Sequence, residues 1–322
     1  MIAVVALAVA VATLLVPTIE ASFGAASRSR ITTSWSATSV KLGTPTTVKG
    51  RVTSKRLQRR TVNLYFYVKS GWRRVATTTS GPRGYYSIKV PTDYYGPRPA
   101  QLRSPAVKGA RAVTSSNRKL TVSPAYAPAG TSAAWSRQTP GEERRFGPCS
   151  PVTYRVNDSQ AVKPGALADV HAAFARLHEA TGIPFRYLGR TTTFPQGTEP
   201  LPGDTDIAVA WGQDDDTGWD LSGGALATSD VLATRAARDK QGAVRRILSA
   251  GVMLNAAEDD YSSSMRQGIL LHELGHALGL GHTADTNQRM EENVWDGETT
   301  RWGAGDLAGL RRVGIAEGCV YG

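Results

Sequence analysis

The longest run of hydrophobic residues in this chain of 322 residues lies at its start. Residues 2–16 are apolar except for Thr13, and small residues follow, with candidate cleavage sites after Ala21 and Ala26. Such a run is short for a membrane span of ~20 residues and is typical of a secretory signal peptide, although the usual basic residues before it are missing. We therefore predict a signal peptide at residues 1–26 and a secreted, extracellular protein; an uncleaved anchor is the alternative.

Residues 28–122 show the period-two alternation of β-strands. In residues 61–68 the apolar side chains share one face, and Asn63, Tyr65 and Tyr67 share the other. Similar short runs, separated by Gly, Pro and Ser, occur at residues 46–52, 72–77 and 85–90 and near Ile31, Leu102 and Leu120. About seven strands in about 90 residues are typical of an Ig-like β-sandwich. The stretch from Val48 to Val90 also resembles the Ig-like modules of many secreted bacterial proteins.

The pattern changes twice after this segment. Residues 123–148 contain four prolines among Ala, Ser and Gly without an apolar period, which predicts an extended linker. Residues 149–322 then alternate between strand-like and helical patterns, which predicts a second, α+β domain. The strand-like runs lie at residues 152–156, 206–211 and 251–255, and the helical periods lie at residues 164–181, 266–281 and 305–313.

The net charge of +11 divides unequally between these domains. Residues 28–122 hold twenty Lys and Arg and a single acid, Asp93, whereas residues 123–322 carry a net charge of −7. We expect the basic module either to hold the protein on an anionic cell-surface polymer or lipid surface, or to act as a soluble spacer. Nucleic acid is not expected as the partner of an exported protein, and we expect a monomer.

Cysteine usage agrees with export. The chain has two cysteines, Cys149 and Cys319, which bracket the C-terminal domain. In an oxidising compartment an even number of cysteines favours a disulfide, and two unrelated thiols are the alternative. We predict that a Cys149–Cys319 bond joins the ends of this domain.

The strongest chemical signal is the sequence HELGHALGLGH at residues 272–282. On a helix, His272 and His276 lie one turn apart on the same face and can bind one ion, while Glu273 stands close to a water on that ion. Gly279 and Gly281 can take the positive φ that turns the chain back and brings His282 to the ion. Three imidazoles leave a fourth position open, as in catalytic zinc sites. Shuffling would produce this motif in roughly four chains per million, so coincidence is excluded.

The motif resembles that of the metzincin zinc peptidases, and the position of Met290, eight residues after His282, resembles the matrixin branch. Three further stretches are similar: residues 205–211 to the edge strand beside the substrate cleft, residues 223–227 to the Gly-rich stretch, and residues 305–310 to the start of the C-terminal helix. The resemblance implies a twisted mixed sheet with an active-site helix, one catalytic Zn²⁺ bound by His272, His276 and His282, and Met290 beneath it. It implies that Glu273 is the general base of peptide hydrolysis, so that a protein or peptide is the substrate.

The chain departs from the matrixin pattern after the methionine. Glu291, Glu292 and Asn293 replace the residues that shape the specificity pocket, so no substrate preference carries over. The sequence around Cys149 is also a poor match to the family's inhibitory cysteine propeptide. The alternative to a secreted zinc metalloendopeptidase is a non-catalytic adhesion protein with a vestigial zinc site.

Two other groups of residues are weaker candidates. His171 and His178, seven positions apart on one helix, are expected to be packed or exposed rather than metal ligands, since no third ligand has matching spacing. Acidic clusters occur at residues 214–216, with Asp220, and at residues 258–260. They are interpreted either as Ca²⁺ ligands or, with more weight, as solvated loops, because they show no regular ligand register.

Overall fold

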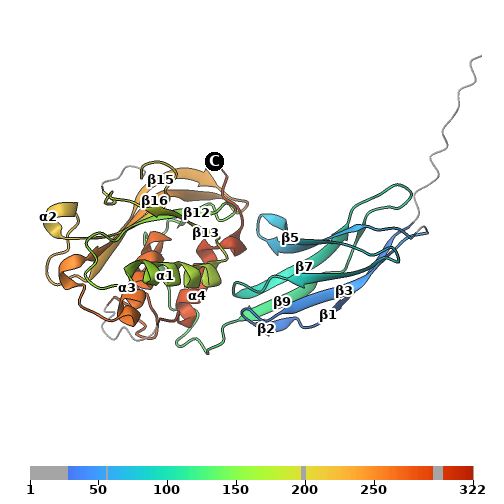
Figure 1. Ribbon diagram of the computed structural model, residues 1–322, viewed down its shortest axis with the longest axis horizontal. Coiled ribbons are helices and arrows are strands. Elements are labelled where there is room, and N and C mark those ends of the chain that lie inside the picture. Colours follow the sequence, from blue (N-terminus) through green and yellow to red (C-terminus); the bar gives the residue numbers. More distant parts are fainter. Residues whose placement is uncertain (1–27, 56, 197–200, 293–299, 322) are drawn as a thin grey trace, which may run out of the picture.

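The computed structural model describes residues 28–55, 57–196, 201–292 and 300–321, and the predicted signal peptide lies outside these residues. The described chain forms two units that lie end to end (Figure 1). None of the described helices is long and apolar enough to span a membrane. We call residues 28–123 the N-terminal unit and residues 139–321 the C-terminal unit.

The N-terminal unit consists of two β-sheets around one buried apolar core. The first sheet has the order β1-β3-β6, with β1 (Arg30–Trp35), β3 (Thr46–Thr53) and β6 (Tyr85–Val90). The second has the order β2-β9-β7-β4-β5, with β8 paired to β7; its strands are β2 (Ser39–Lys41), β4 (Thr61–Val68), β5 (Gly71–Thr79), β7 (Gly96–Ser104), β8 (Val113–Thr114) and β9 (Arg118–Ser123). Every predicted strand run is confirmed, and two short strands, β2 and β8, escaped the pattern because they are too short to show a period.

The alternation of β4 explains why these sheets pack. Val62, Leu64 and Phe66 are almost fully buried, whereas Tyr65 is half-buried and Tyr67 is exposed on the opposite face. A strand whose successive side chains point to opposite faces can therefore bury one face in the core and present the other to solvent.

The C-terminal unit contains a mixed sheet of the order β11-β16-β14-β12-β13, with β15 paired to β16. Its strands are β11 (Arg144–Arg145), β12 (Val152–Asn157), β13 (Phe185–Arg190), β14 (Ile207–Gly212), β15 (Ala227–Arg238) and β16 (Ala243–Asn255). All pairs are parallel except β15–β16. The predicted likeness of residues 205–211 to an edge strand is wrong: β14 lies between β12 and β16, and the antiparallel β15 lies outside β16.

Helices cover one face of this sheet (Figure 1). They are α1 (Ala166–Thr181), α3 (Ser263–Ala277) and α4 (Ala304–Val313), with the short elements α2 (Asp214–Thr217), η1 (Ala256–Glu258) and η2 (Ile315–Glu317). The apolar positions that predicted α1 are buried, among them Val170, Phe174 and Leu177, and Gly182 ends the helix with a φ of +70°. The core between helices and sheet positions α3, which carries two of the candidate metal ligands.

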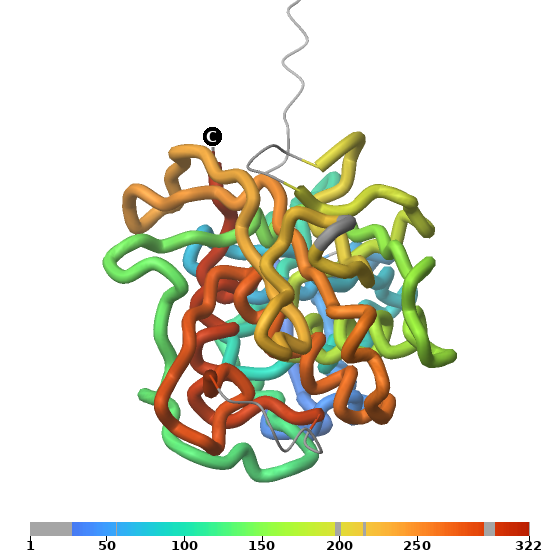
Figure 2. Tube along the Cα trace, turned by 90° about the vertical axis from the view of Figure 1, so that its left-hand side faces the viewer, coloured from blue at the N-terminus to red at the C-terminus, as the bar shows by residue number. Residues whose placement is uncertain are grey.

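The segment predicted as a linker is packed against the C-terminal unit over much of its length. Within this segment, strand β10 (Ser136–Arg137) pairs with β17 (Leu280–Gly281). Strand β11 joins the large sheet beside β16. Figure 2 shows this green segment running beside the red C-terminal part of the chain. We call residues 129–138 the strap. It differs from an extended linker because its backbone finds hydrogen-bond partners on the second unit, among them Ala304 N–H, which donates to the Ala129 carbonyl at 2.8 Å.

The two units also touch directly. Tyr95 N–H donates to the Glu179 carbonyl at 2.7 Å, and Lys69 N–H donates to the Ala316 carbonyl at 3.1 Å. The side chain of Lys69 forms an ion pair with Glu317. These contacts join the N-terminal unit to the C-terminal end of α1 and to η2, so the two units share an interface.

Candidate metal centre

Helix α3 carries His272, Glu273 and His276. The Ser262 side chain caps its start by accepting a hydrogen bond from Met265 N–H at 3.2 Å. The helix ends at Ala277, four residues before the predicted end, and Gly279 then turns the chain with a φ of +99°. A Cβ at position 279 would lie 2.7 Å from the Arg144 carbonyl oxygen, so glycine is required both for the turn and for the close approach.

Gly281 does not take the positive φ that the sequence suggested. It lies in β17, where an added Cβ would come within 2.5 Å of the Arg137 carbonyl oxygen of the strap. Glycine is needed there because two backbones approach closely, and the sharp turn belongs to Gly279 alone.

The turn brings His282 to the two helical histidines. The three Nε2 atoms form a nearly equilateral triangle, with separations of 3.0 Å for His272–His276, 3.0 Å for His276–His282 and 3.1 Å for His272–His282. Among the described residues this is the one group of three potential ligands with such geometry. Zinc binds imidazole nitrogen at about 2.0–2.1 Å, so a single ion can reach all three atoms.

Hydrogen bonds on the far side of the rings support this role. The Nδ1 atoms of His272 and His276 lie 2.8 Å from the carbonyl oxygens of Arg289 and Leu280. A carbonyl only accepts, so each Nδ1 must carry the proton and each Nε2 presents a lone pair to the centre of the triangle. Burial lowers the pKa of His272 to about 3 and that of His276 to about 4, which keeps both rings neutral and able to bind a cation.

Glu273 lies beside this triangle on the wall of a cleft and is 8% exposed. Burial raises the pKa of its carboxyl to about 7. The hydroxyl of Ser229, in β15, lies 2.5 Å from Glu273 Oε2 and 3.0 Å from the Glu273 carbonyl oxygen. With a pKa near neutrality, the carboxyl can both take up and release a proton in the range where many enzymes work.

Met290 is buried beneath the helix, at 1% exposure. A Cβ at Gly275 would lie 2.3 Å from Met290 Sδ, so the thioether packs against the helix between His272 and His276. Asp306 holds this segment from below by accepting hydrogen bonds from the N–H groups of Arg289 at 2.6 Å and Met290 at 3.1 Å. The floor of the site is thus fixed by a buried carboxylate on α4.

The strap holds the third histidine. The Ser136 hydroxyl donates to the His282 carbonyl at 2.6 Å, and Gln138 N–H donates to the Gly279 carbonyl at 3.0 Å. Together with the β10–β17 pairing, these bonds fix the short chain segment between the helix and His282.

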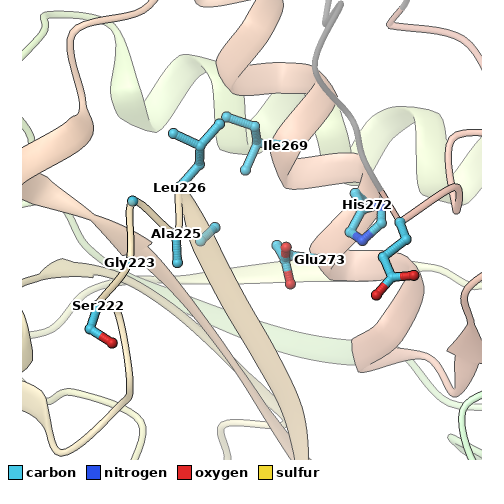
Figure 3. Close-up of a pocket in the computed structure, with 10 residues that line it drawn as sticks. Ser222, Gly223, Ala225, Leu226, Ile269, His272 and Glu273 are labelled. Carbon is cyan, nitrogen blue, oxygen red and sulfur yellow. The ribbon is translucent and has the colours of Figure 1, made fainter.

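The cleft in front of the triangle is formed by two adjoining cavities, of about 440 Å³ over the histidines and about 300 Å³ beside them. His272, Glu273, Ala227 and Glu292 line both cavities. Figure 3 shows the second cavity, where Leu226 and Ile269 point toward one another beyond Glu273. The Gly-rich residues 223–227 of the sequence therefore form a wall of the cleft, leading into the edge strand β15.

The other candidate histidines do not join this centre. His171 Nδ1 lies 2.7 Å from the Tyr154 hydroxyl, whereas His178 Nδ1 lies 2.8 Å from the Ile183 carbonyl oxygen. His178 Nε2 is 3.5 Å from Asp93, the single acid of the N-terminal unit. These separate partners agree with packed side chains.

The acidic clusters are engaged by protein groups where the structure describes them. Asp214 accepts a hydrogen bond from Leu221 N–H, and the Asp220 carboxylate accepts from Ser222. Asp259 pairs with Arg266, and Asp260 pairs with Lys163. Among the described residues, these clusters contain no group of three Asp, Glu, His or Cys side chains whose ligand atoms come together.

Cys149 and Cys319 are joined by a disulfide, with their Cα atoms 5.2 Å apart. The bond ties the chain before β12 to the segment after η2, close to the contact with the N-terminal unit, where Ser70 Oγ lies 3.6 Å from Cys319 Sγ. It joins the two ends of the C-terminal unit.

Sequence reasoning missed Ser136, Ser229 and Asp306. Each acts on the site from an element distant in sequence, at separations of 146 residues for Ser136–His282 and 44 residues for Ser229–Glu273. Asp306 fell within the stretch that resembled the matrixin C-terminal helix, and that resemblance was the only signal available for it. A serine or aspartate without a local motif cannot be assigned to a site from one sequence.

Comparison with known families agrees with this geometry. The family model for Peptidase M10, described as Matrixin, matches residues 148–313, slightly more than half of the chain. The match includes the histidine triangle, Glu273, Met290 and Asp306. No curated protein matches the chain.

Proposed function

Because this chain belongs to the matrixin family of metallopeptidases, we propose that it is a secreted zinc-dependent endopeptidase whose general base is Glu273. The observation that carries the proposal is the triangle of Nε2 lone pairs, 3.0 to 3.1 Å apart, with the Glu273 carboxyl in the same cleft. His272, His276 and His282 would hold the zinc ion. When bound, zinc would supply a Lewis acid that polarises a water and the scissile carbonyl.

The residues of the chain account for the movement of protons. Glu273 would take a proton from the attacking water and deliver it to the departing amine. The Ser229 hydroxyl would orient the carboxyl through its hydrogen bond to Oε2. The neutral state of His272 and His276 would keep them as ligands rather than as acids.

The edge strand β15 suits an extended peptide substrate. Among the described strands it pairs with β16 alone. Apart from Arg238, whose N–H and carbonyl group bond to Tyr321, its other edge carries backbone groups that can pair with another strand. Peptides that bind by adding a strand to a sheet use backbone hydrogen bonds for affinity and alternate side-chain pockets for specificity. The cavity between Leu226 and Ile269 would receive one such side chain.

We further propose that the N-terminal unit is an Ig-like sandwich that holds the enzyme on an anionic cell-surface polymer. On the solvent face of its larger sheet, the Arg103 guanidinium lies 4.6 Å from the ring centre of Tyr65 and 5.2 Å from that of Trp72. Tyr67 is 43% exposed on the same face. Arginine held by aromatic rings, in a unit of charge +19, is suited to phosphate or carboxylate groups of such a polymer.

The peptidase proposal is tested by comparing the wild-type protein with Glu273→Gln. We expect both proteins to bind about one zinc ion each, and the variant to cleave an unfolded protein substrate at least a hundredfold more slowly. Glu258→Gln, which changes an exposed glutamate on η1, serves as the control and should retain full activity.

Equal cleavage by Glu273→Gln and wild type would reject the assignment of Glu273. Zinc binding without any cleavage by the wild-type protein would favour the alternative of a non-catalytic adhesion protein. The attachment proposal is tested separately, by retention of the Glu273→Gln protein on an anionic glycan matrix. Retention should fall as salt is raised, and salt-independent passage through the matrix would reject it.

A further inference from the structure

A third cavity, of about 190 Å³, lies between the two units and shares no lining residue with the cleft at the histidine triangle. Its walls come from β4 and the start of β7 in the N-terminal unit and from the end of α4 and η2 in the C-terminal unit. Four charged side chains line it: Lys69, Arg98, Arg311 and Glu317. Positive charge therefore predominates in this cavity.

Arg98 is the unusual member of this group because it is only 3% exposed. Its guanidinium lies over the ring of Tyr94, 3.5 Å from the ring centre, and 5.2 Å from that of Phe66. One terminal nitrogen, Nη2, donates to the Tyr94 carbonyl. Nε and Nη1 are buried and have no hydrogen-bond partner among the described residues. A buried cation with two unused donors is costly unless a partner fills the place.

Arg311 brings a second guanidinium to the same cavity. Its Nη2 donates to the Pro97 carbonyl at 2.9 Å, and a Cβ on Gly96 would lie 2.0 Å from its Nη1, so it packs closely against the first residues of β7. Burial lowers the pKa of both arginines, and this effect outweighs the opposing influence of Asp93 on Arg98 and of Glu317 on Arg311. Two like charges have thus been brought together across the junction of the units.

The carboxylates nearest to these arginines are engaged elsewhere. Glu317 forms ion pairs with Lys69 and, at 3.2 Å, with Arg312. Asp93 pairs with His178 at 3.5 Å. Neither Arg98 nor Arg311 forms an ion pair with a described residue, in contrast to the buried arginines of the C-terminal unit.

We propose that this cavity is a binding site for a small oxyanion, phosphate or a phosphomonoester group, held between Arg98 of one unit and Arg311 of the other. Guanidinium groups bind such oxygens through paired N–H donors, and the anion would neutralise two adjacent cations that form no ion pair with a described residue. Because the two arginines belong to different units, the bound anion would also strengthen the junction. The proposal does not depend on peptidase activity.

The test measures binding of inorganic phosphate, and separately of glycerol 3-phosphate, to the full chain by calorimetry and thermal unfolding at constant ionic strength. We expect saturable binding, with an unfolding temperature about 5 °C higher when phosphate exceeds its dissociation constant a hundredfold. Chloride at the same ionic strength should have no such effect. Binding of phosphate alone would indicate a free ion, and binding of both would indicate that a phosphate group on a larger molecule is accepted.

Arg98→Met and Arg311→Met should each weaken phosphate binding at least tenfold, whereas Arg118→Met, at an exposed position of the same unit, should leave it unchanged. If Arg98→Met does not fold, Arg311→Met alone decides, because its side chain is only partly buried. The proposal is overturned if the wild-type protein binds neither anion, or if Arg311→Met binds phosphate as tightly as the wild type does.

Discussion

Arg98 in the N-terminal unit and Arg266 in the C-terminal unit are both buried guanidinium groups, and the protein balances them differently. Arg266 donates to Asp169 at 2.8 Å and to Asp259 at 3.4 Å, and both carboxylates are buried with it. Arg98 has aromatic rings and one backbone carbonyl instead. The difference arises from composition, since residues 28–122 contain only one acid with which twenty basic residues could pair.

The comparison shows that net charge is a poor guide to either unit. In the C-terminal unit, buried charges are matched within the fold, as with Arg145 and Asp239. In the N-terminal unit, buried arginines contact aromatic rings and carbonyl oxygens instead of carboxylates. An external anion could therefore still bind to them. The C-terminal unit has one comparable feature, the three histidine lone pairs that converge without an internal partner. The histidine triangle thus offers ligands for a cation, and the cavity at Arg98 offers donors for an anion.

The largest effect is expected on zinc binding by the three histidines. His276→Ala removes one corner of the triangle, and we expect it to bind zinc at least a thousandfold more weakly, because the open site would keep only two imidazole ligands. Competition with a chromogenic chelator measures the affinity. His171→Ala, on α1, provides the control and should bind zinc as the wild type does.

The contrast between the buried arginines is sharpened by two matched substitutions. Arg266→Met leaves Asp169 and Asp259 buried without their partner, and we expect it to lower the free energy of unfolding by about 3–5 kcal/mol. Arg98→Met leaves no carboxylate uncompensated, so its effect in phosphate-free buffer should be below about 1 kcal/mol. Denaturant unfolding measures both values. Equal losses would show that the two arginines are balanced alike.

Replacing both Cys149 and Cys319 with serine should destabilise the C-terminal unit by about 2–4 kcal/mol, because the bond closes a loop of 170 residues in the unfolded chain. Thermal unfolding of the double variant, with zinc kept saturating, gives the value. The histidine triangle lies apart from this bond, so the zinc stoichiometry should not change. Loss of zinc would show that the disulfide supports the site directly.

The smallest effect is expected at the one acid of the N-terminal unit. The hydrogen bond with Asp93 raises the pKa of His178 and lowers that of Asp93. The histidine contribution to the stability of the junction is therefore fully present below 6.5, the pKa of an unfolded histidine, and is lost as pH rises through the raised pKa of the folded protein. In acid the pair also weakens, because Asp93 takes up a proton. Since the Asp93 side chain is 58% exposed, we expect less than about 1 kcal/mol. Thermal unfolding of wild type and Asp93→Asn should differ at pH 5.5 and converge at pH 8.5.

The features that could be predicted from the sequence are those that depend on residues close together along the chain. The alternation in residues 61–68 predicted β4, and the spacing of His272, His276 and His282 predicted their convergence. The position of β14 inside the sheet, and the pairing of the strap with β17, depend on contacts between distant segments, and a short strand of two residues has no period to read. The partners of Glu273 and Met290 could not be found for the same reason.

The strap has a consequence for the order in which the chain is made. Ser136 leaves the ribosome about 145 residues before the segment around His282 that it borders, and Asp306, which holds Arg289 and Met290, follows later still. Contacts between such distant segments form slowly and only after most of the chain is available. A chain that ends before Asp306 would therefore hold the histidines without one of the residues that fix them, so the metal centre can take its final form only after Asp306 has been made.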